Sequence, residues 1–311
     1  MDSPALEMIK LRLGDAHARQ RLALEQRCER ITQRRFKFLH RDAWYAHPTV
    51  IRTVLRAMGL YRRGQRNAEQ VVVARNVVES PDLPPPFDGF TILHLSDLHA
   101  DMSTGAFESV LRLIADLRYD LCVMTGDYRG PTYGPCEPAL RAMSRLRAQL
   151  RGEAYAVLGN HDSLALASGL ESIGFRLLLN ESEAVHRGGQ RIFIAGIDDA
   201  HYFRTADIAR ATSNIPAGAF AILLSHTPEV FRQAAEAGFK LQLSGHTHGG
   251  QICLPGSIPI TLDSWVPRRM GTGAWRHGAM CGYTSRGAGT SIVPVRFNCP
   301  PEITLRELRR A

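Results

Sequence analysis

The chain has 311 residues, 44% hydrophobic and 22% charged, which is typical of a soluble globular protein of one large or two small domains. No apolar run approaches the roughly 18 residues of a membrane-spanning helix. The six cysteines show no Cys-x-x-Cys spacing, which argues against a zinc ribbon and a disulfide-stabilised scaffold. We therefore expect a reducing, cytoplasmic environment.

The formal net charge of +8 belongs to the N-terminal part of the chain. Residues 1–66 hold 15 Lys and Arg against 6 Asp and Glu, whereas the remainder is nearly neutral. Good helix formers at helical spacing predict a helix over residues 5–40, and a second amphipathic helix follows Pro48. We therefore divide the chain into a basic helical extension, residues 1–66, and a second domain, residues 67–311.

Two roles for the basic extension stay open. It packs on the domain with its arginines in solvent, or it rests on an anionic membrane surface, which would place the protein peripherally on the inner membrane. No recognition motif favours nucleic acid as a partner. The pair Arg34-Arg35 resembles a twin-arginine export signal, but charged residues follow it instead of an apolar stretch, so we do not expect export.

From residue 71 onward, short apolar strands alternate with helices, which predicts an α/β fold. The predicted helices cover residues 107–117, 139–150 and 229–237. The predicted strands cover 71–78, 90–95, 121–124, 154–158, 191–197, 220–224 and 239–243, with closing strands at 282–286, 290–297 and 302–308. In such folds ligands bind beyond the carboxyl ends of the strands.

Polar side chains that can bind metals follow the predicted strands. They are Asp97, His99, Asp127, Asn160, His226, His246 and His248. This mixture of nitrogen and oxygen ligands suits Zn, Mn or Fe rather than Ca or Mg. Seven ligands exceed one site that must stay open to substrate, but they fill two sites if one carboxylate bridges. Two divalent ions about 3.5–4 Å apart hold a bridging hydroxide that can attack phosphorus.

Five motifs occur in the order found in one enzyme superfamily. Asp97-Leu98-His99, Gly126-Asp127, Gly159-Asn160-His161-Asp162, Ser225-His226 and Gly245-His246-Thr247-His248 resemble those of the calcineurin-like metallophosphoesterases. The trailing Gly249-Gly250-Gln251 and the segment 283–287 are similar to a bacterial branch that is often membrane-attached. The resemblance covers about residues 70–311. It implies a four-layer fold of two packed β-sheets flanked by helices.

The resemblance also implies a role for each motif residue. Asp97, His99 and His248 would hold the first metal, Asn160, His226 and His246 the second, and Asp127 would bridge them. His161 would be the general acid for the leaving oxygen. Asp162 would be an orienting carboxylate, or alternatively the N-cap of a helix.

The chain departs from the protein phosphatases of this superfamily after Asp127. They continue with Val-Asp-Arg-Gly, whereas Tyr128-Arg129-Gly130 stands here, so the carboxylate that pairs with their catalytic histidine has no counterpart. This argues against a protein phosphatase. Arg129 either contacts the substrate phosphate or, as we favour, is an ordinary surface residue. We expect Asp198 and Asp199 to form a structural turn.

The remaining histidines have no predicted role in the site. His94 is expected in the core, and no partner at useful spacing is found for the others: His17, His40, His47, His186, His201 and His277.

The favoured function is hydrolysis of a phosphodiester or pyrophosphate by two divalent metals (Mn, Zn or Fe). In the branch that the chain resembles, the substrate could be a lipid precursor such as UDP-2,3-diacylglucosamine. One alternative is a phosphomonoesterase or nucleotide phosphatase. Another is a basic membrane- or nucleic-acid-docking module with a vestigial metal site, although a decayed site should have lost at least one ligand.

Overall fold

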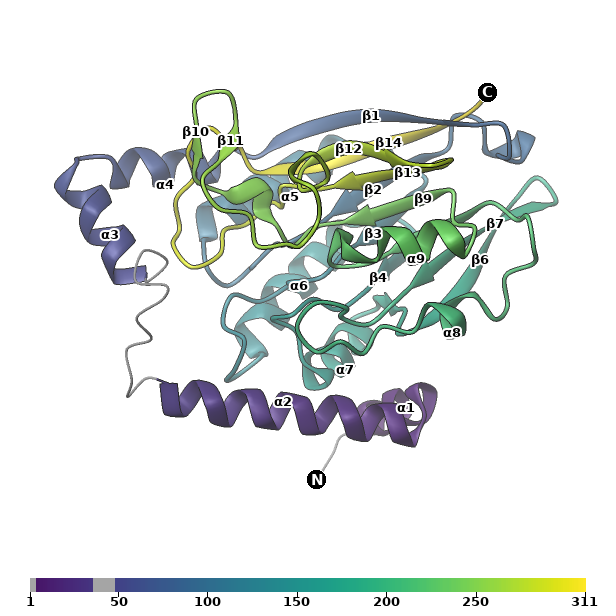
Figure 1. Ribbon diagram of the computed structural model, residues 1–311, viewed down its shortest axis with the longest axis horizontal. Helices are drawn as coiled ribbons and strands as arrows, with labels where there is room; N and C mark the ends of the chain where they lie inside the picture. Colours follow the sequence, from purple (N-terminus) through teal and green to yellow (C-terminus); the bar gives the residue numbers. More distant parts are fainter. Residues whose placement is uncertain (1–3, 36–47) are drawn as a thin grey trace.

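A computed structural model describes residues 4–35 and 48–311, and two six-stranded β-sheets lie at its centre (Figure 1). In spatial order, the first sheet contains β1 (Val72–Ser80), β14 (Glu302–Arg310), β2 (Thr91–Leu95), β3 (Leu121–Met124), β4 (Ala154–Ala156) and β5 (Arg176–Leu177). The second contains β12 (Gly273–His277), β13 (Met280–Thr284), β9 (Leu241–Ser244), β8 (Ala221–Leu224), β7 (Gln190–Gly196) and β6 (Glu181–Arg187). A small hairpin pairs β10 (Cys253–Leu254) with β11 (Ile258–Pro259).

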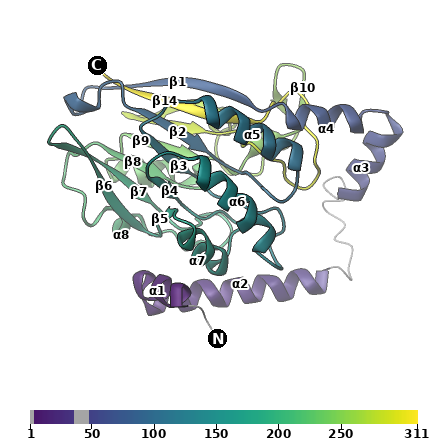
Figure 2. The ribbon, with the colours of Figure 1, turned by 180° about the vertical axis from the view of Figure 1, so that it is seen from behind.

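Helices cover the outer faces of both sheets (Figures 1 and 2). The first sheet is covered by α5 (Thr104–Asp116), α6 (Glu137–Gln149) and α7 (Leu164–Ser172), and the second by α8 (Ile208–Thr212) and α9 (Phe231–Glu236). Short 3-10 turns occur at η2 (Pro85–Phe87), η3 (Pro228–Val230), η4 (His248–Gly250) and η5 (Arg268–Met270).

Apolar side chains on both faces of the strands produce this four-layer arrangement. Successive strand residues point to opposite faces of a sheet. On β3, Leu121 and Val123 enter the core between the two sheets, whereas Cys122 and Met124 pack beneath the helices of the first sheet. The predicted four-layer metallophosphoesterase fold is therefore confirmed.

The N-terminal segment forms α1 (Pro4–Leu13), α2 (Asp15–Arg35), α3 (Pro48–Ala57) and α4 (Tyr61–Glu69). Ile9 and Leu13 of α1 are fully buried in the same core as α5 to α7. By contrast, no residue of α3 is buried. Helix α4 crosses the predicted boundary at residue 66 and buries Gly64 and Ala68. Part of this segment therefore belongs to the core of the domain.

Three details of the predicted elements are wrong. The single helix expected from residue 5 is interrupted at Gly14, whose φ of 82° lies in the left-handed region. The predicted strand 290–297 is an irregular segment, because Ile292 also has a positive φ of 63° and Pro294 has no N–H to donate. Helices α7 and α8 and strands β5, β6, β10, β11 and β12 were not expected. The last part of the predicted first helix, residues 36–40 with His40, lies outside the described residues, and so does His47.

Within residues 4–35 and 48–311, no helix combines the length and the apolar character needed to cross a membrane.

Candidate metal centre

All seven predicted metal ligands follow the carboxyl ends of β2, β3, β4, β8 and β9 or lie in the loops just beyond them. Five of them have a positive φ between 38° and 71°: Asp97, His99, Asp127, His246 and His248. For residues other than glycine this conformation is strained, and it clusters at functional sites where the surroundings enforce it. The backbone thus turns these side chains out of the strand direction and toward a common centre.

The first group consists of Asp97, His99 and His248, all buried. The Nε2 atoms of His99 and His248 lie 3.2 Å apart, and His248 Nε2 lies 3.5 Å from Asp97 Oδ1. The Nδ1–H of His99 donates to the backbone oxygen of Arg129 over 2.8 Å, because a carbonyl oxygen can only accept. The lone pair of His99 Nε2 therefore faces the other two side chains.

The second group consists of Asn160, His226 and His246. Asn160 Oδ1 lies 3.0 Å from His226 Nε2 and 2.9 Å from His246 Nδ1, and these two nitrogens are 3.2 Å apart. His226 donates its Nδ1–H to the backbone oxygen of Thr125 over 2.7 Å. As in the first group, this contact directs the Nε2 lone pair inward.

Asp127 lies between the two groups. Its Oδ2 atom is 3.4 Å from His226 Nε2 and 3.7 Å from His99 Nε2. Asp127 also forms a separate candidate metal-binding group with Asp97 and His226. No other described side chain lies within ion-pair distance of imidazoles from both groups.

The spacing of these atoms fits shared divalent cations. Two nitrogens each about 2.1 Å from one ion are about 3.0–3.4 Å apart in octahedral or tetrahedral geometry. The imidazole pairs of both groups, at 3.2 Å, fall within this range. The donor set of imidazoles, carboxylates and one amide suits Zn, Mn or Fe, as the sequence predicts.

The pKa values of the buried groups also fit a site that binds cations. Burial, with a further contribution from Asp127, raises the pKa of Asp97 to about 6. Burial would lower the pKa of His226, but the adjacent Asp127 carboxylate raises it to about 10. Burial likewise lowers the pKa of His99 to about 4. In the metal-free protein a proton on His226 thus supplies positive charge beside these buried carboxylates, and a bound cation would take the place of that proton.

Close approach of two loops requires glycine beside these ligands. A Cβ atom on Gly245 would lie 1.8 Å from Ser96 Oγ and 2.1 Å from Asp97 Oδ2. A Cβ atom on Gly159 would lie 2.2 Å from Asp127 Oδ1. The glycines of these two motifs therefore make room for the carboxylates of the centre.

Asp162 orients the loop that carries Asp127. Its Oδ2 accepts hydrogen bonds from the backbone N–H of Asp127 (2.7 Å) and Gly159 (2.8 Å), and Oδ1 accepts from that of Tyr128 (3.0 Å). The alternative of a helix N-cap is wrong, because Ser163 caps α7.

His161 is held by the loop that follows Asp127. Its Nδ1–H donates to the backbone oxygen of Gly130 over 2.5 Å, and Thr132 Oγ1 lies 3.2 Å from the same nitrogen. A carbonyl oxygen, rather than a carboxylate, thus faces this ring nitrogen. The other ring nitrogen, Nε2, lies 4.0 Å from Asp127 Oδ2.

The expectation of a surface Arg129 is wrong. Its side chain is buried and donates to the backbone oxygens of His161 (2.7 Å), Gly134 (3.1 Å) and Thr132. Arg129 thereby ties the 130–136 loop to His161. The expected turn at Asp198-Asp199 is present, because Asp199 accepts from the backbone N–H of Tyr202 and Phe203.

Two histidines for which no partner was expected have one. The ring centroid of His201 lies 4.6 Å from that of His246, and His201 Nδ1 lies 3.0 Å from Glu229. His17 Nε2 lies 3.4 Å from Asp198 Oδ2. These contacts join segments far apart in the chain, so spacing in the sequence carries no signal of them. His94 is buried in the core as predicted.

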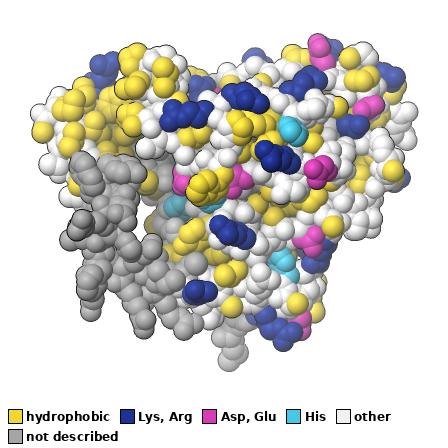
Figure 3. All heavy atoms as spheres, in the orientation of Figure 1, with side chains coloured by type: hydrophobic (Ala, Val, Ile, Leu, Met, Phe, Trp, Pro, Cys, Tyr) yellow, Lys and Arg dark blue, Asp and Glu magenta, His cyan; other side chains and the backbone are white. Residues whose placement is uncertain are grey.

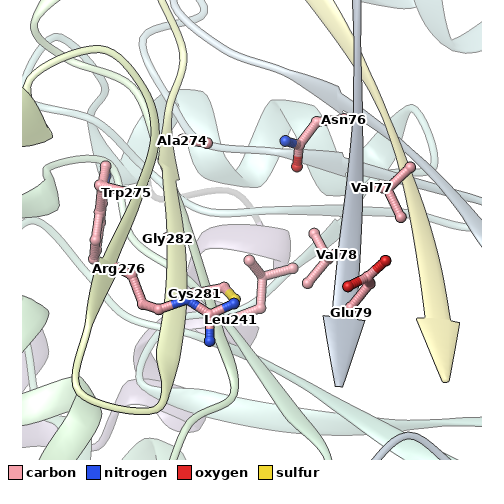
Figure 4. A pocket seen from close by; sticks show the side chains of 10 residues that line it. All are labelled: Asn76, Val77, Val78, Glu79, Leu241, Ala274, Trp275, Arg276, Cys281 and Gly282. Atoms are coloured by element: carbon pink, nitrogen blue, oxygen red, sulfur yellow. The ribbon is translucent and has the colours of Figure 1, made fainter. Parts of the chain in front are cut away.

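A cavity of about 500 Å³ lies elsewhere, between β1 and the strands β9, β12 and β13 (Figure 4). Leu241 and Cys281 line it near the beginnings of β9 and β13, whereas the metal-binding groups follow the carboxyl ends of strands. None of the seven predicted ligands lines this cavity. It is therefore separate from the candidate metal centre.

Comparison with known proteins agrees with this geometry. The family described as calcineurin-like phosphoesterase matches residues 90–250. The chain is 30% identical to the uncharacterized metallophosphoesterase YkuE of Bacillus subtilis (strain 168), over 77% of this chain and 86% of that protein. It is 26% identical to the phosphodiesterase YaeI of Escherichia coli (strain K12), over 70% of this chain and 82% of that protein.

A third relative is a transmembrane protein with metallophosphoesterase domain from Danio rerio, 28% identical over 84% of this chain and 62% of that protein. The matched family region spans more than half of the chain and contains all seven residues of the centre. The resemblance to the calcineurin-like superfamily is thus confirmed. The chain belongs to the calcineurin-like phosphoesterase family and is a phosphoester hydrolase.

Proposed function

We propose that this chain hydrolyses phosphodiesters or pyrophosphates at a centre of two divalent metal ions. The observation that carries the proposal is the position of Asp127, whose Oδ2 lies 3.4 Å from His226 Nε2 and 3.7 Å from His99 Nε2. A carboxylate between two groups of imidazoles fits a bridging ligand. Asp97, His99 and His248 would hold one ion, and Asn160, His226 and His246 the other.

When bound, two such ions supply Lewis acidity toward phosphoryl oxygens and lower the pKa of a coordinated water. The protein supplies the positioning and the proton. The Nδ1–H of His161 is engaged by the carbonyl of Gly130, so Nε2 is the ring nitrogen from which the protonated imidazole can release a proton. Its side chain is 20% exposed, so substrate can reach it. We therefore assign His161 to protonation of the leaving oxygen.

The diester class is supported by one relative's name, phosphodiesterase YaeI, and by the absence of the protein-phosphatase pattern after Asp127. A phosphomonoesterase or nucleotide phosphatase is the alternative. A binding module with a vestigial site is disfavoured, since all seven ligand positions come together.

A lipid-linked substrate, such as UDP-2,3-diacylglucosamine, belongs to the same proposal. Val54 of helix α3 is 49% exposed, and Met58, which follows the helix, is 63% exposed. The cationic residues Arg52 and Arg56 lie close to them in the sequence. The β10–β11 hairpin exposes Leu254 and Ile258 by more than half. Figures 1 and 2 place α3, α4 and this hairpin at one end of the molecule, and hydrophobic side chains gather at the upper left in Figure 3. This end fits an anionic membrane surface.

Hydrolysis of bis(p-nitrophenyl) phosphate and p-nitrophenyl phosphate, with added Mn²⁺ and with chelator, tests the reaction. We expect chelator-sensitive turnover that favours the diester and falls at least about a hundredfold in Asp127→Asn. Asp116→Asn, an exposed acidic residue on α5, is the matched control and should match wild type. Preference for the monoester would replace the proposal with a phosphatase. Absence of both turnover and Mn²⁺ binding would favour the binding module.

Sedimentation with vesicles tests the membrane surface. We expect binding to vesicles containing anionic phospholipid, weaker binding to zwitterionic vesicles, and a loss in the double variant Val54→Asp, Met58→Asp. Val77→Asp, an exposed apolar residue (52%) on β1, is the control. Equal binding by the double variant and the control would contradict a membrane role for α3.

A further inference from the structure

We infer that Arg21 and Glu25 of α2 position the loop of residues 159–164, so that the N-terminal helix helps to build the metal centre. The inference rests on the proposed function, because this loop carries Asn160 and His161. Arg21 and Glu25 are positioning residues, since neither touches the centre itself.

The side chain of Arg21 is fully buried beneath this loop. Its Nη2 donates to the backbone oxygen of Asp162 over 2.8 Å, across 141 positions of the chain. Its guanidinium lies 3.4 Å from the ring centroid of Phe203, which fixes its plane. Asp198 Oδ1 lies 3.7 Å from Nη1. Arg21 thus joins α2, the 159–164 loop and the segment after β7.

Glu25, one helical turn later, holds the other side of the same loop. Its Oε1 accepts from Arg21 Nε (3.1 Å) and from the backbone N–H of Leu164 (3.0 Å). The two side chains therefore form hydrogen bonds with the backbone of Asp162 and Leu164. These residues lie on either side of Ser163, which caps α7. Both ends of this turn depend on α2 for a hydrogen-bonding partner.

Displacement of this turn would shift the proposed metal ligands, because Asp162 connects the turn to them. Its carboxylate holds the backbone N–H groups of Asp127 and Tyr128 in place. Asn160, a proposed ligand, lies two residues earlier in the same loop. Removing the contact at the Asp162 carbonyl therefore loosens the carboxylate that fixes the proposed bridging ligand.

The energetics of burial favour positioning over stability as the role of Arg21. Desolvating a guanidinium and its carboxylate partners costs several kcal/mol per ion, and apolar residues of similar size often stabilise a core at least as well. Arg21 is nevertheless buried against Glu25 and Asp198, with side-chain exposures of 15% and 0%. What an apolar side chain cannot supply is the directed hydrogen bond to the loop.

The test compares Arg21→Met with Arg19→Met, which removes an equal charge from an exposed position (78%) of the same helix. The Mn²⁺ dissociation constants, from electron paramagnetic resonance, and kcat and KM for bis(p-nitrophenyl) phosphate are measured well below the melting temperature. The melting temperature of the metal-free protein is measured separately. For Arg21→Met we expect Mn²⁺ affinity and kcat each to fall about tenfold or more, with KM nearly unchanged, as for other residues that orient metal ligands. Arg19→Met should match wild type.

A merely structural role predicts another result. A folded Arg21→Met protein with a lower melting temperature but wild-type Mn²⁺ affinity and kcat would overturn the inference. If Arg21→Met does not fold, Arg21→Lys and Glu25→Met replace it. Arg21→Lys keeps the charge and should retain more Mn²⁺ affinity than Glu25→Met, which leaves the Leu164 N–H without its partner. Wild-type affinity and kcat in both would overturn the inference as well.

The same experiment separates this inference from the proposed function. If wild type neither binds Mn²⁺ nor hydrolyses either ester, the proposed function fails. If wild type is active and Arg21→Met equals it, only the positioning role fails.

Discussion

The carboxylate of Asp162 accepts a hydrogen bond of 2.7 Å from the backbone N–H of Asp127. The same carboxylate accepts from the N–H groups of Gly159 and Tyr128, so both of its oxygens face donors. This residue therefore fixes the backbone from which Asp127 reaches both groups of the metal centre. We therefore propose that Asp162 holds Asp127, a proposed metal ligand, in place and does not itself bind a metal.

Asp162→Asn should impair Mn²⁺ binding and catalysis, although an asparagine side chain has nearly the same shape as aspartate. An amide NH₂ would face an N–H donor in place of an accepting oxygen, leaving buried groups unsatisfied at a cost of about 1–3 kcal/mol. We expect kcat for bis(p-nitrophenyl) phosphate to fall about tenfold or more and Mn²⁺ to bind more weakly. Urea unfolding, kinetics and Mn²⁺ titration check this result. Wild-type Mn²⁺ affinity in the variant would contradict the role given to Asp162.

His161→Asn should reveal a general acid through its dependence on the leaving group. A p-nitrophenolate departs without a proton, whereas an alkoxide requires one. We expect kcat to fall about 10²–10⁴-fold for an alkyl phosphodiester but much less for bis(p-nitrophenyl) phosphate. His186→Asn, on β6 and remote from the centre, is the control. Equal losses for both substrates would show that His161 acts by some means other than proton donation.

Gly245→Ala should disrupt the first group of ligands. The new Cβ would lie 1.8 Å from Ser96 Oγ and 2.1 Å from Asp97 Oδ2, so Asp97 must move. We expect the Mn²⁺ stoichiometry to fall below two and activity to be lost. Gly152→Ala is the control: its φ of 67° is strained for alanine, at about 1–2 kcal/mol, but nothing lies within 4 Å of the added atom. Full Mn²⁺ loading of Gly245→Ala would contradict the packing described.

Asp198 should make stability depend on pH in acid. Burial would raise its pKa, but the charge of Arg21 and hydrogen bonds from His17 and Thr205 lower it from 3.8 to about 2. A carboxylate whose pKa is lower in the folded than in the unfolded protein stabilises the fold at pH values above the unfolded-state pKa. This contribution is lost as the pH falls toward about 2. Asp198→Asn should therefore differ from wild type by about 2 kcal/mol more at pH 7 than at pH 2.

Urea unfolding of the chelated, metal-free protein at several pH values measures this difference. Asp15→Asn, whose side chain is 80% exposed, is the matched control and should show no such trend. A difference between Asp198→Asn and wild type that stays constant from pH 7 to pH 2 would rule out the ionised carboxylate as its source.

Deletion of residues 1–66 cannot separate membrane binding from catalysis. It would remove Ile9, Leu13 and Arg21 from the interior along with the exposed α3. Substitutions on α3 alone leave these buried contacts in place. This is the reason that the vesicle test uses Val54 and Met58.

The sequence by itself determined which side chains meet at the metal centre and in which class of fold. Each ligand follows a strand in its own local segment, and parallel strands bring their carboxyl ends to one edge of each of the two sheets. The short apolar strands alternating with helices predict an α/β fold, and the sandwich of two sheets is implied by the resemblance to a known family. These features depend on neighbours along the chain, so they can be predicted from periodicity and motif order.

Only the tertiary structure decided how those ligands are held. The contact of Arg21 with Asp162 spans 141 positions, and that of His161 with the carbonyl of Gly130 uses a backbone atom that every residue possesses. The contact of His201 with Glu229 joins the loop after β7 to η3. No local pattern encodes such partners, because buried polar groups take whichever donor or acceptor the folded chain brings within reach.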